Sequence, residues 1–285
     1  MKRIPKVVFF YWGAPVLPYL RYMCLKSFHK YNPDWKIVLY TPTQLTTTQS
    51  WSTCENKQTF NTEDYSDRLS GLGVEVCKFD MEAIGFPNTL PEVLKSDILR
   101  LHLLATVGGL WSDSDIIYFR PITHAFQQTD HNAFFCFRRG GPTQEDTRKN
   151  GPRYHSIGFM AGAPGNVYFT QLFTGVGKAL NTTQYQSVGS TYYKTLLNDG
   201  NIDCLPDIFN IPIDTVYPSR AVPGMLVGPL QQYINHIHQG VIGWHWYCGH
   251  PVAGELQNKA TESTYQGMSN IVCWLVANVN NGVQV

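Results

Sequence analysis

The chain has 285 residues, a formal net charge of +1, 43% hydrophobic residues and only 15% charged residues. This length allows one large domain or two small ones with a substantial core, and the composition excludes a disordered chain. The nearly neutral charge does not favour a general polyanion binder, so we expect no nucleic-acid partner.

The first 40 residues predict a strand, a helix and a second strand. Lys6 to Trp12 is a short β-rich run, and the Gly-Ala-Pro that follows it ends the strand. Leu17 to Tyr31 spaces its apolar residues as an amphipathic helix that stops at Asn-Pro, and Lys36 to Tyr40 reads as the next strand. A unit of this kind implies parallel strand pairing, with a ligand crevice at the carboxyl ends of the strands.

The middle of the chain predicts a third strand and a long helix. Thr41 to Leu69 is polar and weakly patterned, either a surface excursion or a short helical insert, and Val74 to Phe79 resembles a strand. Pro91 to Val107 carries one apolar stripe and predicts a helix. Gly108 and Gly109 follow where a left-handed C-cap is wanted, and a strand comes directly after them.

The second half predicts one more strand, Ala133 to Arg138, and a helix near Val167 to Leu180. Neither an internal repeat nor a low-complexity linker is present. The sequence therefore predicts one α/β domain over residues 1–285.

Two acids stand one residue apart at the end of an apolar run. Side chains alternate along an extended strand, so Asp113 and Asp115 are expected to point to the same side. Two carboxylates converging at a strand end suit a divalent cation such as Mg²⁺ or Mn²⁺. Alone, so short a motif more often marks a solvated loop, in which two acids and two serines merely end the strand.

Three motifs in order, spanning residues 4 to 250, resemble a known family of transferases. The stretches SDILR (96–100) and GGLWSDSD (108–115) resemble the S-D-x-x-R…G-G-x-Y-x-D-x-D pattern of D-x-D glycosyltransferases with a sugar-binding region. These are capsular-polysaccharide and mannosyltransferase-like proteins, related to the large clostridial glucosylating toxins. IPKVVFFYWG (4–13) resembles the I-P-k-x-I-h-x-x-W-x-G opening of the family, and His245-Trp246 resembles its C-terminal H-H-W-x-x-S-W segment.

The resemblance implies a glycosyltransferase A-type α/β fold, with a Rossmann-like nucleotide-binding sheet and the D-x-D at a strand end. Residues 1–120 would form the nucleotide-sugar half, and residues 121–285 the acceptor-side half with a C-terminal closing segment. The implied reaction moves a hexose-type sugar from a nucleotide-diphosphate donor to a glycan or other hydroxyl acceptor, with retention of configuration. A bound Mn²⁺ or Mg²⁺ would neutralise the charge that builds up on the departing diphosphate.

The resemblance assigns three residues to the cation. Asp115 would bind the metal directly, and Asp113 would contact ribose or sugar, or reach the metal through water. His245 would complete the metal shell, in a segment that folds back over the nucleotide. As a free-standing zinc site, the histidine-rich run 234–250 fits no strong spacing template.

The resemblance also assigns three residues to the donor. Asp97 would hold hydroxyls of the donor sugar, Arg100 would lie near sugar and phosphate, and Trp12 would stack on the nucleobase. Asp97 and Arg100 are three residues apart, so an ordinary surface ion pair on the helix is the alternative. For Trp12 the alternative is a core residue. Tyr11 and Phe10 are expected to be packing residues.

Other classes of protein also carry two acids at this spacing. A haloacid-dehalogenase-like phosphatase normally carries its D-x-D after the first strand, whereas about 110 residues precede this one. A calcium-binding loop fails because Ile117 occupies the third ligand position. A non-catalytic relative that binds a nucleotide sugar or a glycan stays open, because Gly249-His250 replaces the Ser-Trp of the family and HSIGFMAG (155–162) lacks a family Asn.

The sequence favours a cytoplasmic protein. No window reaches the 18 or so apolar residues of a membrane span, and Pro5 and Lys6 interrupt the N-terminal apolar run, which makes it a poor signal peptide. Seven scattered cysteines without a C-x-x-C pair are typical of reduced thiols.

Overall fold

A mixed seven-stranded sheet with the order β3-β2-β1-β4-β7-β6-β8 forms the centre of the protein. The computed structural model describes residues 3–46, 63–126, 132–137, 155–196, 208–219 and 228–283. Four neighbouring strands pair in parallel, as the strand–helix–strand pattern predicts: β1 (Val7–Tyr11), β2 (Lys36–Pro42), β3 (Glu75–Phe79) and β4 (Gly109–Ser112).

The other half of the sheet reverses direction. Strand β7 (His155–Gly162) is antiparallel to both β4 and β6 (Ala133–Phe137), and β8 (Ile208–Pro212) runs parallel to β6 on the edge. A separate two-stranded sheet joins β5 (Ile116–Tyr118) to β9 (Gly243–His245) in antiparallel register. This small sheet brings the C-terminal part of the chain beside the D-x-D.

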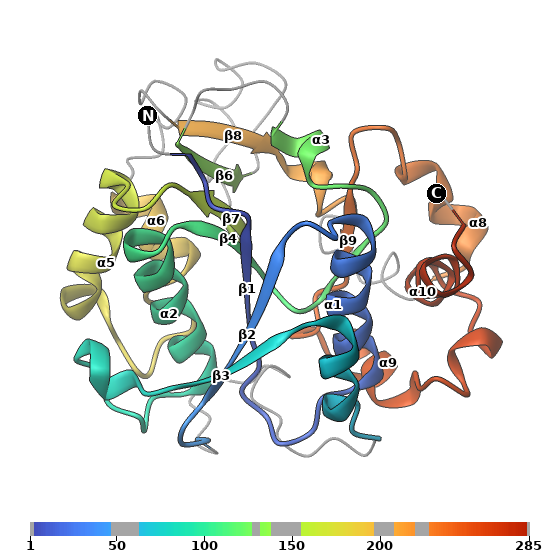
Figure 1. Cartoon of the computed structure of the whole chain (residues 1–285), viewed down its shortest axis with the longest axis horizontal. Helices are drawn as coiled ribbons and strands as arrows, with labels where there is room; N and C mark the ends of the chain where they lie inside the picture. The colour runs from blue at the N-terminus through green and yellow to red at the C-terminus, as the bar shows by residue number, and fades with distance from the viewer. Residues whose placement is uncertain are drawn as a thin grey trace.

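Helices cover both faces of the sheet, so the protein has three layers (Figure 1). On one face lie α2 (Glu92–Thr106), α5 (Val167–Ala179) and α6 (Ser190–Leu196), and on the other lie α1 (Tyr19–Tyr31) and α10 (Ile271–Asn281). The remaining helical segments are short: η1 (Ser66–Leu72), η2 (Met81–Ile84), α3 (Thr123–Phe126), η4 (Ile213–Thr215), α8 (Leu230–Tyr233), η5 (Ile234–His236), α9 (Pro251–Lys259) and η6 (Tyr265–Gly267).

Strand β1 shows how the sequence builds two cores. Its side chains alternate, so Val8 and Phe10 pack in the apolar cluster on the α1 face, while Phe9 and Tyr11 belong to the cluster on the α2 face. A strand buried on both faces reads as a continuous apolar run, which is what the sequence shows here.

Most predicted element boundaries agree with the structure to within two residues. Gly108, with φ +69°, supplies the left-handed residue predicted after α2. Of the polar stretch 41–69, residues 47–62 lie outside the described part of the chain, and so do Arg138 and the cysteines Cys54 and Cys204. The five cysteines that the structure describes are free thiols.

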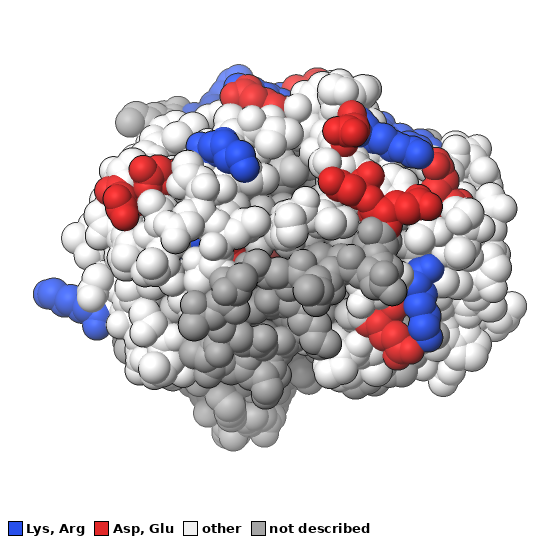
Figure 2. Space-filling view, turned by 90° about the horizontal axis from the view of Figure 1, so that it is seen from below, with Lys and Arg blue, Asp and Glu red and all other residues white. Residues whose placement is uncertain are grey.

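Exposed charges are mixed in sign. On the face shown in Figure 2, Lys and Arg side chains lie beside Asp and Glu side chains, and no broad patch of one sign appears among the described residues. Exposed ion pairs include Lys36–Glu75 and Arg68–Glu262. Among the described residues, no helix combines the length and the apolar composition that crossing a bilayer requires.

Candidate functional site

A cavity of about 400 Å³ opens at the carboxyl ends of β1 and β4, where an α/β sheet normally binds its ligand. All six residues singled out from the sequence line it: Trp12, Asp97, Arg100, Asp113, Asp115 and His245. They come from strand ends, from helix α2 and from β9, separated by up to 233 residues (245 − 12) in the chain.

The two acids lie in the turn between β4 and β5, so the predicted alternation along an extended strand is wrong. Strand β4 ends at Ser112, because the backbone turns there to enter the second, smaller sheet. The turn is fixed at both ends: the Asp113 N–H donates to the Gly158 carbonyl at 2.7 Å, and the Trp246 N–H donates to the Asp115 carbonyl at 3.0 Å. Backbone hydrogen bonds, and not strand geometry, therefore hold the two carboxylates near each other.

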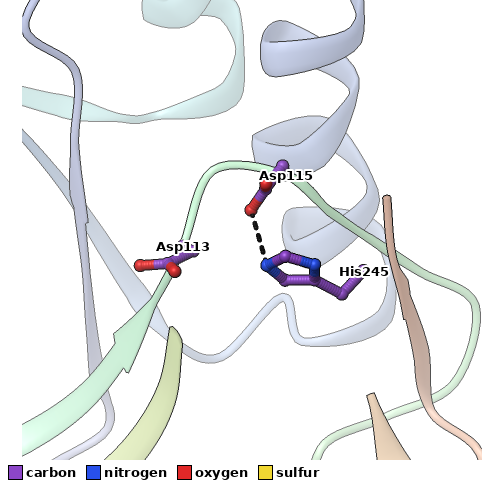
Figure 3. Close-up of side chains that lie close together, drawn as sticks. All are labelled: Asp113, Asp115 and His245. Carbon is purple, nitrogen blue, oxygen red and sulfur yellow. Dashed lines mark ion pairs between the residues drawn. The ribbon is translucent and has the colours of Figure 1, made fainter. Parts of the chain in front are cut away.

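Asp115 is a buried carboxylate that faces the imidazole of His245 (Figure 3). Its Oδ2 accepts a hydrogen bond from the Cys248 N–H at 3.0 Å, and its Oδ1 lies 3.1 Å from His245 Nε2. Burial favours the protonated acid, but the attraction of His245 and Arg21 and the Cys248 N–H outweigh it and hold the pKa of Asp115 below its usual value. Asp115 is therefore an ionised carboxylate at neutral pH.

Asp113 is the more accessible of the two acids, with 29% of its side chain exposed. Its Oδ1 accepts a hydrogen bond from Trp111 Nε1 at 2.9 Å and lies 3.5 Å from Arg100 Nη2. Trp111 is almost fully buried, and its indole N–H orients the Asp113 carboxylate. Asp113 thus presents its remaining lone pairs to the cavity.

The hydrogen bonds of His245 define its tautomer. Its Nδ1 accepts from the Tyr247 N–H at 3.1 Å, so the proton of the neutral ring resides on Nε2, which faces Asp115 Oδ1. A metal bound at Nε2 would replace that proton and leave the Asp115 carboxylate as a second ligand.

The side chains of Asp113, Asp115 and His245 together fit a divalent cation. One ligand atom from each of Asp113, Asp115 and His245 lies within 4.8 Å of the others. Asp115 Oδ1 is buried and makes no well-formed hydrogen bond to the described residues beyond its 3.1 Å approach to His245 Nε2, so it can serve as a ligand atom. Two carboxylates and an imidazole are a donor set suited to Mn²⁺ more than to Mg²⁺.

Asp97 and Arg100 form a buried pair, and the alternative of a surface ion pair is wrong. Both residues are 3% exposed, and Arg100 Nη2 lies 3.1 Å from Asp97 Oδ1. Arg100 Nη1 donates to the Ile157 carbonyl at 2.6 Å, and the guanidinium stands 4.9 Å from the centre of the Trp111 ring. Burial alone would lower the pKa of Arg100, but Asp113 and Asp97 raise it, so the cation is permanent.

Trp12 belongs both to the cavity and to the edge of the core. Its indole lines the cavity, its Nε1 donates to the Val16 carbonyl at 2.8 Å, and the Arg21 guanidinium lies 4.7 Å from its ring centre. The ring is partly buried against the cluster on the α1 face. This placement is compatible with base stacking, which stays a prediction.

Replacing Trp12 by alanine is expected to weaken binding of a free nucleoside diphosphate by about 1–3 kcal/mol, the usual scale for base stacking on an aromatic ring. Trp35→Ala is the matched control, because Trp35 also packs at the edge of the same cluster and does not line the cavity. Calorimetry on both variants is the measurement. Equal affinity in the wild type and in the Trp12 variant would make Trp12 a packing residue only.

Arg21 is a site residue that the sequence reading missed. Its Nε donates to Gln257 Oε1 at 2.7 Å, its Nη1 donates to Ser114 Oγ at 3.0 Å, and its guanidinium stacks near Trp12 and Trp246. It thereby ties α1 and α9 to the D-x-D turn. The signal was available, because a charged residue on the apolar stripe of a predicted helix needs a buried partner.

Tyr11 and Glu92 were also missed. Tyr11, expected to be a packing residue, lines the cavity and donates its hydroxyl hydrogen to Glu92. Glu92 accepts further hydrogen bonds from the Thr46 N–H and from Lys95 Nζ, both at 2.8 Å. A side chain at Gly13 would overlap the Glu92 carboxylate and force it to shift. Neither residue had a sequence signal, because these contacts join distant segments.

The fold is a glycosyltransferase A-type fold. The chain is similar to the galactosyltransferase LgtC solved with donor and acceptor sugar analogues, at 14% identity and a TM-score of 0.50, covering 98% of this chain and 96% of that one. It is also similar to the apo form of the glycosyltransferase GlyE of Streptococcus pneumoniae TIGR4, at 11% identity and a TM-score of 0.50, covering 99% of this chain and 65% of that one.

Residues 81–176 match the family model described as capsular polysaccharide synthesis protein. The match covers about a third of the chain and contains α2 and the D-x-D turn, so the predicted resemblance to capsular-polysaccharide proteins is confirmed over these residues. No curated protein sequence matches the chain.

Proposed function

We propose that the protein is a metal-dependent, retaining glycosyltransferase that moves a hexose-type sugar from a nucleotide-diphosphate donor to a glycan or another hydroxyl acceptor. The observation that carries the proposal is the cavity itself, which gathers the D-x-D acids, the buried Asp97–Arg100 pair and His245 at the ligand-binding edge of a glycosyltransferase A-type sheet. Fold and family match support the general class, and the donor and the stereochemistry are part of the proposal.

Different residues of the cavity would bind different parts of the donor. Trp12 at the end of β1 offers a flat surface for the base, and Asp113, Asp115 and His245 would hold the cation. When bound, Mn²⁺ or Mg²⁺ supplies positive charge where the leaving diphosphate becomes negative. Arg100 supplies a permanent positive charge beside Asp113, and Asp97 keeps its guanidinium oriented.

A non-catalytic nucleotide-sugar or glycan binder is the second candidate, because the changed C-terminal motif lies at the cavity. Gly249 and His250 both line it. His250 Nδ1 accepts from the Val252 N–H at 3.3 Å and caps helix α9, so this histidine has a structural role in place of the Trp of the family. The four groups on which the cation and the sugar would depend, Asp97, Arg100, Asp113 and Asp115, are all present.

The deciding experiment incubates the protein with a panel of nucleotide sugars and Mn²⁺ and follows release of the nucleoside diphosphate. We expect release with one donor, lost on addition of excess chelator and restored by added Mn²⁺ or Mg²⁺. Full turnover in excess chelator would contradict the proposed requirement for a divalent cation. Tight donor binding without release, in the presence of candidate glycan acceptors, would favour the non-catalytic binder.

His245→Gln tests the third ligand. The variant is expected to need a higher Mn²⁺ concentration for half-maximal activity and to recover most activity at saturating Mn²⁺, because one of several ligands is lost. His236→Gln, an exposed histidine outside the cavity, is the control and should titrate like the wild type. A lower thermal stability with an unchanged metal affinity would remove His245 from the metal shell.

A further inference from the structure

One buried tyrosine hydroxyl stands at the wall of the cavity. Tyr217, just after η4, is 3% exposed and lines the cavity. Its oxygen makes no well-formed hydrogen bond to the residues that the structure describes, although the Ser156 hydroxyl lies beside it. Leaving such a group unpaired costs about 1–3 kcal/mol, so folding alone would favour phenylalanine at this position.

The hydroxyl lies beside the same glycine as the Asp113 carboxylate. A Cβ built on Gly158 would overlap the Asp113 carboxylate and come within 2.6 Å of the Tyr217 oxygen. The two polar groups therefore both pack against the bare backbone of Gly158, and both line the cavity. The Tyr217 ring packs against His245, with 4.7 Å between ring centres, which fixes the direction of its hydroxyl.

The chemistry of these two groups suits a sugar hydroxyl better than a phosphate. The Asp113 carboxylate only accepts hydrogen bonds, and an ionised phosphate oxygen has no hydrogen to donate to it. The Tyr217 hydroxyl has a hydrogen to donate. A sugar hydroxyl can donate to Asp113 and accept from Tyr217 at once, which satisfies both groups.

We propose that the Tyr217 hydroxyl binds a hydroxyl group of the transferred sugar and so helps to select the donor. This inference rests on the proposed function and extends it, because it names a residue that reads the sugar and not the nucleotide. Tyr217 acts by binding, and we assign it no part in bond making or breaking.

Tyr217→Phe is the test, with Tyr193→Phe as the matched control. Tyr193 is 1% exposed and its hydroxyl also lacks a well-formed hydrogen bond to the described residues, but it does not line the cavity. Calorimetry in Mn²⁺ would use UDP and GDP, then UDP-glucose, UDP-galactose and GDP-mannose. Thermal unfolding of each ligand-free variant would be measured in parallel.

We expect Tyr217→Phe to bind the preferred nucleotide sugar about fivefold to tenfold more weakly, the scale of one neutral hydrogen bond, with unchanged affinity for the matching nucleoside diphosphate. Its melting temperature should equal or exceed that of the wild type. Tyr193→Phe should bind both ligands like the wild type.

Three other outcomes would contradict the inference, and one of them would also contradict the proposed function. Equal losses for sugar nucleotide and diphosphate would move the contact to the phosphates and overturn sugar selection. If Tyr217→Phe bound every ligand like the wild type, water would be the partner of the Tyr217 hydroxyl. The inference would then fail while the proposed function stood. If the wild type bound no nucleotide sugar in Mn²⁺, the proposed function would fail and the inference with it.

Discussion

Replacing Asp115 by asparagine is expected to lower turnover by at least about a hundredfold, because the charge that holds a catalytic cation is lost. The change is nearly isosteric, and the amide oxygen can still accept the hydrogen bond that Cys248 N–H gives to Oδ2 at 3.0 Å. The turn should therefore survive. Binding of Mn²⁺, measured by calorimetry, should weaken together with activity.

The control for this variant is Asp34→Asn. Asp34 is an exposed aspartate that pairs with Lys6, and it does not line the cavity. Its loss should change neither the rate nor the metal affinity. If the Asp115 variant turned over like the wild type, the D-x-D turn would have no catalytic role.

The order of helices and strands was predictable from the sequence, but the position of the C-terminal part of the site, which includes His245, was not. Val7–Tyr11 and Lys36–Pro42 are strands because β-rich apolar runs end at turn residues, and that signal is short-range. The pairing of Ile116 with His245 joins residues 129 positions apart (245 − 116), and β5 and β9 are only three residues long. No periodicity can be read over three residues, so only the family resemblance placed His245 near the acids.

The reversal of the sheet also escaped prediction. Strand β7 is antiparallel to β4, and its Gly158 both fixes Asp113 through a backbone hydrogen bond and leaves room for the Tyr217 hydroxyl. A parallel strand here would have needed a covering helix, which the sequence pattern does not exclude. Roles such as those of Arg21 and Tyr217 depend on which groups meet after folding, so residue types alone could nominate a site but could not complete it.

Replacing Arg100 by lysine should be damaging although it keeps the positive charge. The guanidinium contacts several groups at once. Its Nη1 donates to the Ile157 carbonyl, and its Nη2 lies 3.1 Å from Asp97 and 3.5 Å from Asp113. The group also lies over the ring of Trp111. An ammonium keeps the charge but has neither the planar fork nor the stacking surface. At least one buried acceptor would lose its partner, which costs about 1–3 kcal/mol of folding free energy.

Arg68→Lys is the matched control for that change. Arg68 also pairs with a carboxylate, Glu262, and stands 5.0 Å from the ring centre of Tyr65, but 48% of its side chain is exposed. A surface pair of this kind is worth about 0–1 kcal/mol, so the control should unfold and turn over like the wild type.

We expect the Arg100 variant to lose about tenfold to a hundredfold in turnover, the scale of a misplaced positioning group, and to melt at a lower temperature. Turnover measured well below that melting temperature separates the two effects, because a folded but slow enzyme shows that the fork itself matters. If Arg100→Lys proved as mild as Arg68→Lys in both assays, the buried ion pair on α2 would be a feature of packing, and the sugar and phosphate end of the proposed donor site would have to lie elsewhere in the cavity.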